Sequence, residues 1–193
     1  MKNLKKITIV AFTLVIMFSF AACKKSSPSK VVEKELKSLQ TESVDDVDIP
    51  LINEDTSENK GLKEKYNNWI KMLQKFDYKI GEEKISKDGK TATVQVKITT
   101  YGFGEAYKSV YNQMIEDTKS GKITSSTDIE KYTFDLMFDK MLALKDKSYS
   151  KEVIIKCTQN DGKWSTDIRG NHDFTDAILG GMMSEIGALA GSM

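Results

Sequence analysis

The sequence predicts an α+β fold in which N-terminal helices pack on a curved antiparallel sheet of two hairpins. Two stretches alternate apolar and polar residues with a period of two, and an Asp-Gly pair interrupts each stretch. The segments before and between these stretches carry apolar residues with the spacing of a helix face. Because the order is helices, hairpin, helices, hairpin, the strands pair with near neighbours and the sheet is expected to be antiparallel.

The first helix is expected to follow a short polar tether. Ser27 is suited to the N-cap and Pro28 to the first helical turn, where a missing N–H costs nothing. The apolar residues then recur at i, i+4 and i+7: Val32, Leu36 and Leu39. From Thr41 to Gly61 the chain is acidic, with a small apolar group at Ile49, Leu51 and Ile52. The spacing of a calcium loop is absent there, so we interpret this stretch as a solvated surface connection.

A second helix and the first hairpin follow this connection. Leu62–Phe76 recovers the helical period, and we expect it to pack on the sheet. The hairpin runs over Tyr78–Ile85 and Thr91–Tyr101, and Asp88-Gly89 supplies the positive φ of its turn. The strand after the turn places every second apolar residue on one face: Ala92, Val94, Val96 and Ile98. The other face of this sheet is therefore in water.

Two more helices are predicted between the hairpins. The first of them stops at Gly121, where a left-handed C-cap is favoured. The next begins at Thr127-Asp128-Ile129-Glu130, which has the pattern of a capping box with Thr127 as the N-cap. Apolar residues occupy two of its faces, so we expect it to be covered on more than one side. It is either a central core helix or a Met-rich binding surface.

The second hairpin runs over Tyr149–Thr158 and Lys163–Arg169 and turns at Asn160-Asp161-Gly162. Cys157 shares a face with apolar residues of its strand, which predicts a small buried hydrophobe rather than a nucleophile. We expect residues 171–193 to form an apolar, Gly-rich C-terminal tail helix. Because this helix is poor in charge, we expect it to dock on the domain, to self-associate or to contact a bilayer.

The N-terminus has the pattern of an export signal. Lys2, Lys5 and Lys6 form a basic region, the apolar run Ile7–Phe20 follows, and the small pair Ala21-Ala22 precedes Cys23. This pattern resembles the lipobox of bacterial lipoproteins, although Phe20 stands where those proteins most often have Leu. The resemblance implies cleavage after residue 22 and acylation of Cys23, for instance with palmitate. The alternative is an ordinary secreted protein with a free Cys23.

The predicted organisation is then a signal peptide at residues 1–22, a lipidated cysteine and tether at 23–28, one α+β domain at 29–170, and the tail. Anchoring would place the domain on the extracytoplasmic face of the cell membrane. The 26 lysines and arginines after residue 22 meet 28 acidic residues, a formal charge of −2. Such a balance predicts no nucleic-acid partner, because binding to phosphates needs a basic surface.

Signals for catalysis, metals and cofactors are sparse. The chain has one histidine, and Cys157 is the cysteine left after lipidation, so we expect no zinc site. The sequence contains no phosphate-binding or dinucleotide-binding loop, so we also expect no cofactor. His172, Asp173 and Asp176 are the residues that an enzyme hypothesis would use, together with a tyrosine. With Asn171 before them, these residue types at a strand-to-helix junction are equally typical of helix capping.

Three segments resemble the cystatin-like and nuclear-transport-factor-like fold of lipoproteins from Gram-positive bacteria: Pro28–Leu39, Phe76–Val94 with its Asp88-Gly89 turn, and Asp161–Trp164. The resemblance implies a cone between sheet and helices that binds a small apolar ligand or an envelope protein, or, as the alternative, an isomerase- or hydrolase-like enzyme. From the aromatic residues on the helices we predict the ligand-binding set Trp69, Tyr101, Tyr107, Tyr111 and Phe134. Residues for an acid–base pair cannot be placed from the resemblance, so the leading hypothesis is non-catalytic binding.

Overall fold

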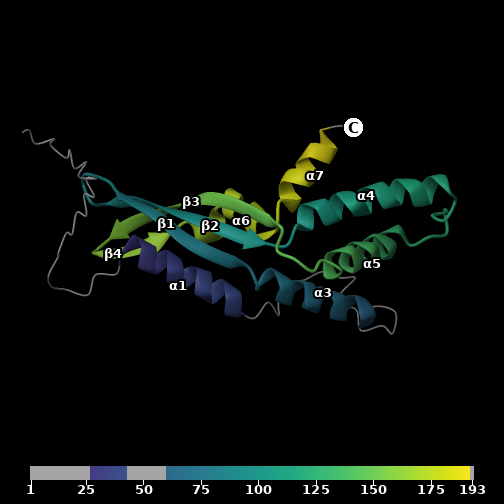
Figure 1. The fold of residues 1–193 in the computed structure, drawn as a ribbon, viewed down its shortest axis with the longest axis horizontal. Helices are drawn as coiled ribbons and strands as arrows, with labels where there is room; N and C mark the ends of the chain where they lie inside the picture. Colours follow the sequence, from purple (N-terminus) through teal and green to yellow (C-terminus); the bar gives the residue numbers. More distant parts are fainter. Residues whose placement is uncertain (1–26, 43–59, 192–193) are drawn as a thin grey trace, which may run out of the picture.

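The computed structural model describes residues 27–42 and 60–191. In this part of the chain the molecule is elongated, with a four-stranded antiparallel sheet toward one end and a group of helices toward the other (Figure 1). The fold is thus the predicted α+β class. The predicted signal peptide, Cys23 and the apolar group at Ile49, Leu51 and Ile52 lie outside the described residues.

The sheet has its strands in sequence order: β1 (Asp77–Ile85), β2 (Thr91–Thr100), β3 (Tyr149–Asn160) and β4 (Lys163–Thr166). Both predicted hairpin turns form, with φ of 70° at Gly89 and 75° at Gly162. These angles lie in the left-handed region that tight hairpin turns need and that glycine adopts at little cost. β2 and β3 pair along their length, from Thr91 opposite Thr158 to Thr100 opposite Tyr149, so the two hairpins form one continuous sheet.

One face of the sheet is buried and the other is open. Val94, Val96, Ile98 and Ile155 are 0% exposed and lie in one cluster, against which Trp164 packs. On the opposite face Lys97 is exposed, and the Gln95 amide donates a hydrogen bond to the Glu152 carboxylate at 3.0 Å. The predicted alternation of β2 is therefore confirmed.

Two helices cover the buried face of the sheet: α1 (Pro28–Thr41), which packs on β1, β2 and β4, and α6 (His172–Ile178), which packs on β2 and β3. The short 3-10 helix η1 (Ile168–Gly170) leads into α6. The Ser27 hydroxyl accepts from the Lys30 N–H at 3.3 Å, so the predicted cap of α1 is confirmed. We call the four strands with α1, η1 and α6 the sheet region.

The other helices form what we call the helical region: α3 (Lys60–Leu73), α4 (Phe103–Lys119), α5 (Ile129–Leu142) and α7 (Met182–Ala190). α5 contacts both α3 and α4, and α7 contacts α4. α5 is thus covered on two sides, as its two apolar stripes predict. The helix α3 packs against α5 instead of the sheet, in a cluster that joins Leu62 and Tyr66 to Phe138. Of the stretch expected to pack on the sheet, Phe76, beyond the end of α3, does lie in the core of the sheet.

The predicted start of α5 is wrong by one residue. Asp128 is the N-cap, and its carboxylate accepts from the Lys131 N–H at 3.0 Å. The Thr127 hydroxyl instead accepts from the Thr124 N–H at 2.9 Å, within the preceding turn. A carboxylate at this position also interacts favourably with the helix dipole, which explains why the aspartate takes the cap.

The single tail helix expected for residues 171–193 is also wrong, because α6 and α7 are separate helices. Gly180 and Gly181 join them with φ of 58° and 81°. The Gly104 N–H donates to the Gly180 carbonyl at 3.0 Å, and a Cβ on Gly180 would collide with the Tyr101 carbonyl oxygen. These glycines therefore make a tight turn that lets the tail dock against the start of α4.

Candidate functional site

A cavity of about 360 Å³ lies where the sheet region meets the helical region. Its wall is mostly apolar and comes from α1, α3, η1 and α6, with these residues among those that line it: Leu39, Ile70, Leu73, Phe76, Ile168 and Ile178. Ligand sites in proteins are commonly concave, mostly apolar and roughly 300–1,000 Å³ in volume. The cavity therefore has the size and character of a site for a small apolar molecule.

The polar groups of the cavity belong to Glu42, Gln74, Arg169 and Thr175. Arg169 Nη2 lies 2.8 Å from Glu42 Oε2, and the Gln74 amide donates to the Glu42 backbone carbonyl at 2.6 Å. The hydrogen bond and the charge of Glu42 raise the pKa of the Arg169 guanidinium. Because the side chains of Arg169 and Glu42 are 57% and 44% exposed, they mark the side of the cavity that reaches water.

These cavity residues are missing from the sequence-based prediction. They come from segments far apart in the chain, and each apolar member has the helical or strand spacing of an ordinary core residue. One signal was available: Arg169 is the chain's single arginine among 29 Lys and Arg residues. A lone residue type points to a position worth testing, but it gives no information about neighbours.

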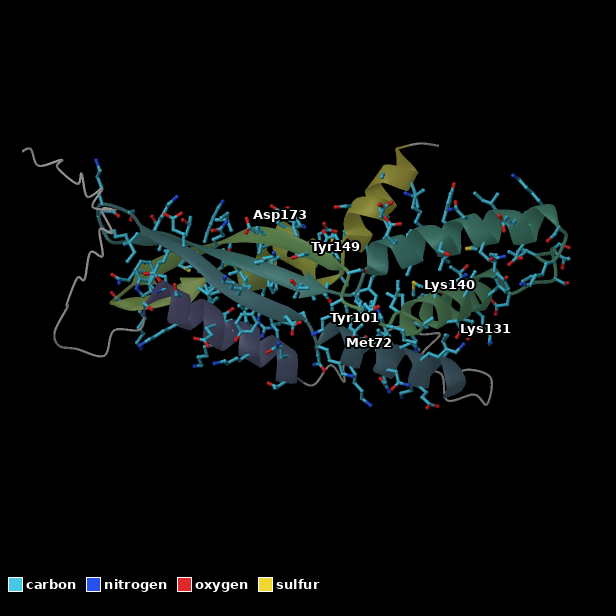
Figure 2. All side chains as sticks on the ribbon, in the orientation of Figure 1. Met72, Tyr101, Lys131, Lys140, Tyr149 and Asp173 are labelled. Carbon is cyan, nitrogen blue, oxygen red and sulfur yellow. The ribbon has the colours of Figure 1, made fainter. Side chains whose placement is uncertain are left out.

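The predicted aromatic set lies in the helical region and beside it rather than around this cavity. The Trp69 ring lies 5.8 Å from the ring of Phe138, and Phe134 stacks on Phe138 at 6.1 Å. Tyr101 lies where the sheet meets the helices (Figure 2). Its ring is 5.8 Å from that of Phe103, in a cluster that also includes Tyr107. Hydrophobic packing therefore accounts for these four positions, and their role in binding stays a prediction.

Tyr111, the fifth member of the set, has a different environment. It lines a hollow of about 370 Å³ on the side of α4, together with Met114, Ile115, Thr118 and Lys119. All five residues come from one helix, so this hollow is a surface groove without a second wall among its lining residues. It offers an apolar molecule less burial than the cavity between the regions.

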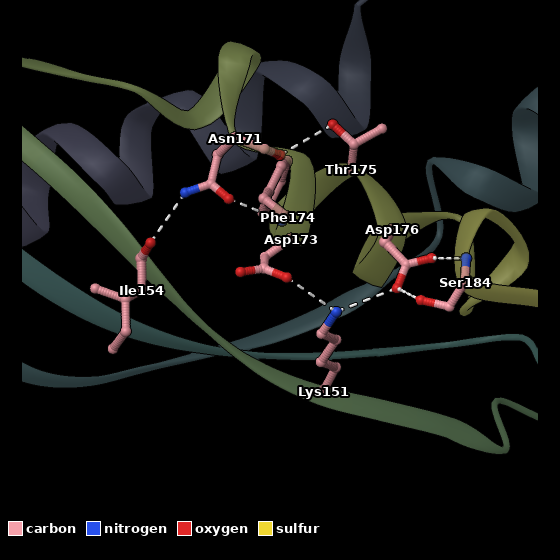
Figure 3. Close-up of polar contacts among 8 residues, drawn as sticks. All are labelled: Lys151, Ile154, Asn171, Asp173, Phe174, Thr175, Asp176 and Ser184. Carbon is pink, nitrogen blue, oxygen red and sulfur yellow. Dashed lines mark hydrogen bonds and ion pairs between the residues drawn. The ribbon is translucent and has the colours of Figure 1, made fainter. Parts of the chain in front are cut away.

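His172, Asp173 and Asp176, the residues of the enzyme hypothesis, lie on α6. Figure 3 shows the two aspartates and their partners. Asp176 is 5% exposed, and its carboxylate accepts from Lys151 Nζ at 3.1 Å, the Ser184 hydroxyl at 2.7 Å and the Ser184 N–H at 3.0 Å. Burial raises the pKa of Asp176, but the hydrogen bonds from Ser184 and Lys151 outweigh burial and hold it below its usual range. The carboxylate thus ties α6 to β3 and to α7.

The neighbours of Asp176 have structural roles as well. Lys151 Nζ lies 3.3 Å from the exposed Asp173 carboxylate, and the Asn171 amide oxygen accepts from the Phe174 N–H at 3.1 Å as the cap of α6. The capping interpretation of this junction is therefore confirmed for Asn171. Among the described residues His172 makes no hydrogen bond or ion pair with Asp176. The structure does not bring these two together as an acid–base pair.

Cys157 is 1% exposed and belongs to the core of the sheet region. Burial, followed by the nearby carboxylates, raises its pKa to about 11, so it is a neutral thiol at physiological pH. The interpretation as a buried hydrophobe is confirmed.

In residues 27–42 and 60–191, no group of three or more His, Cys, Asp or Glu residues is arranged to hold a metal ion. Nor does any helix of this part have the length and apolarity to cross a membrane.

Comparisons with known proteins give little beyond this geometry. A scan against family models gives no match, and a search of curated proteins also gives none. Among solved structures, this chain is similar to a Bacillus subtilis protein described as a "putative lipoprotein (ycdA)", with 17% sequence identity and a TM-score of 0.39. The match covers 79% of this chain and 46% of that one, so this chain spans less than half the length of that protein.

Proposed function

We propose that the protein is a lipid-anchored extracytoplasmic module that is non-catalytic and binds a small apolar ligand in the cavity between α1, α3 and α6. The observation that carries the binding proposal is the cavity itself, whose apolar wall opens to water beside Glu42 and Arg169. The carboxylate of Asp176 is engaged in holding helices together, which supports the non-catalytic hypothesis over the enzyme alternative.

The anchoring proposal rests on the residues before the domain. A basic start, an apolar run and Ala21-Ala22-Cys23 support cleavage and acylation of Cys23. Two acyl chains at about 0.8 kcal/mol per buried CH₂ would hold the protein firmly on the bilayer. We further propose a cystatin-like or nuclear-transport-factor-like relationship, supported by a sheet with one helix-covered face and one open face.

Fatty-acid labelling tests the anchor. Cys23→Ser should abolish incorporation of an alkyne fatty acid and leave unprocessed precursor in the membrane fraction. Cys157→Ala is the matched control, since it removes the other cysteine, which is buried, and should leave labelling unchanged. Labelling that survives Cys23→Ser contradicts the assignment.

Native mass spectrometry of the protein released from its membranes tests ligand binding. We expect a co-purifying small molecule whose retention falls when Ile178→Trp fills the cavity. Tyr107→Phe and Tyr111→Phe are the controls, and they should leave retention unchanged because neither residue lines the cavity. If only the tyrosine variants lose the co-purifying molecule, the result would favour the predicted aromatic set as the binding site. A protein that stays empty in a screen of lipids and metabolites would favour an envelope protein as the partner.

A further inference from the structure

The chain's one arginine lies at the water-facing side of its apolar cavity. The sequence contains 29 Lys and Arg residues, of which Arg169 is the only arginine. The described ion pairs elsewhere use lysine, for example Lys37 with Glu33 and Lys65 with Asp135. A lysine is a point charge, whereas the planar guanidinium matches the two oxygens of a carboxylate. The cavity is therefore the one described place where this chain offers that geometry.

The guanidinium is only partly used by the protein. Among the described residues its side chain makes a single hydrogen bond, from Nη2 to Glu42 Oε2 at 2.8 Å. A guanidinium has five N–H donors. Within the described residues, the other donors of Arg169 make no hydrogen bond to the protein, and the side chain is 57% exposed. Arg169 can therefore accept a second anionic partner at the cavity mouth.

We infer that the ligand is an apolar molecule with one terminal carboxylate, and that Arg169 binds this carboxylate while the apolar body lies against Leu39, Ile70 and Ile178. This inference rests on the proposed function and names its ligand class. A ligand carboxylate on the free donors lies beside the Glu42 carboxylate, and the repulsion between these two negative charges weakens its binding. The ion pair with Glu42 also holds the arginine beside the cavity.

This repulsion predicts opposite effects for the two members of the ion pair. Arg169→Gln removes the binding group and weakens binding of an apolar carboxylate. Glu42→Gln removes the repelling charge and strengthens binding of the same ligand. Both substitutions break the same ion pair between the end of α1 and η1. If the pair had a purely structural role, both variants would bind the carboxylate more weakly than wild type. Arg169→Lys keeps the positive charge but loses the planar geometry of the guanidinium. Its affinity for an apolar carboxylate should lie between those of wild type and Arg169→Gln.

Calorimetric titration of the mature chain, carrying Cys23→Ser and no lipid, is the test. The probes are dodecanoate and dodecanol, which share a chain and differ in charge. Wild type should bind dodecanoate about tenfold more tightly than dodecanol, the difference expected for one charge-assisted pair at a partly exposed site. Arg169→Gln should remove that preference and leave dodecanol binding unchanged. Lys97→Gln, on the open face of the sheet, is the charge-matched control and should have no effect.

The outcomes separate the two proposals. Equal binding of both probes to wild type, or a preference that survives Arg169→Gln, overturns the carboxylate inference and leaves an apolar binding module standing. Weaker dodecanoate binding in both Arg169→Gln and Glu42→Gln also overturns the inference, because it assigns the pair a structural role. A wild-type protein that melts cooperatively but binds neither probe contradicts the proposed function as well.

Discussion

The sheet region and the helical region are stabilised by different kinds of core. In the sheet region, small aliphatic residues such as Val94, Val96 and Val153 alternate along paired strands and are themselves almost completely buried. In the helical region, the rings of Trp69, Phe103 and Phe138 fill the space between helices. The first core is determined by strand register, the second by the shapes of a few large side chains.

This difference has a consequence for function. A register-determined core leaves little room for change, because a shift by one residue moves every side chain to the other face. The cavity of about 360 Å³ lies where α3 of the helical region meets α1, η1 and α6 of the sheet region. A binding site is therefore expected between the two regions rather than within either one.

The largest effect is expected for a charge placed in the core of the sheet region. Val96 is 0% exposed, so Val96→Asp buries a carboxylate without a partner. The cost is several kcal/mol against a typical total stability of about 5–15 kcal/mol, and the domain should unfold. Lys97→Asp, one residue along on the open face, should keep the thermal transition. Equal loss of stability in the two variants would contradict the register.

A smaller effect is expected at the turn that joins the regions. Gly180→Ala combines a positive φ with a collision between the new Cβ and the Tyr101 carbonyl oxygen, and should cost about 3 kcal/mol or more in chemical denaturation. Gly121→Ala is the control, since Gly121 also has a positive φ, of 75°, but open space around it. That variant should lose about 1 kcal/mol. If both variants lose the same amount, the close contact between the α6–α7 turn and α4 is wrong.

A third effect concerns the carboxylate that fastens α7. Asp176→Asn should cost about 1–3 kcal/mol, because its side chain is 7% exposed and accepts charge-assisted hydrogen bonds. Asp173→Asn loses an ion pair to the same Lys151, but its side chain is 77% exposed, and the change should cost under about 1 kcal/mol.

The pH dependence of Asp176 has a definite sign. Its folded-state pKa is lowered, so its contribution is fully present above the unfolded value of about 3.9 and is lost as the pH falls through the folded value. The difference in unfolding free energy between wild type and Asp176→Asn should be constant near neutral pH and should shrink in this acidic range. A difference that grows on acidification would contradict the assignment.

Much of the sheet region could be predicted from sequence because its signals are local. Alternation from Ala92 to Ile98, the Asp-Gly turns and the cap at Ser27 each involve residues close together in the chain. In the helical region the sequence predicts the individual helices but not which helices pack against one another. The spacing of Leu62 and Tyr66 defines an apolar face, yet nothing local shows that this face meets α5 and not the sheet.

The candidate site could not be predicted for the same reason. Leu39, Ile70 and Ile178 meet only after α1, α3 and α6 have packed, and each has the spacing of a core residue. The aromatic set rests on residue type, and the structure places four of its members in hydrophobic clusters. Aromatic content alone does not distinguish a core from a binding surface.

The most direct test of a binding site between the two regions is the isoleucine methyl NMR spectrum of the mature chain during titration with dodecanoate. Chemical-shift changes should concentrate on Ile70, Ile168 and Ile178, which line the cavity. Ile154, exposed on the open face of the sheet, and Ile129, exposed at the start of α5, should remain unchanged. Changes confined to Ile115, in the groove beside Tyr111, would instead place binding on α4 and contradict this account.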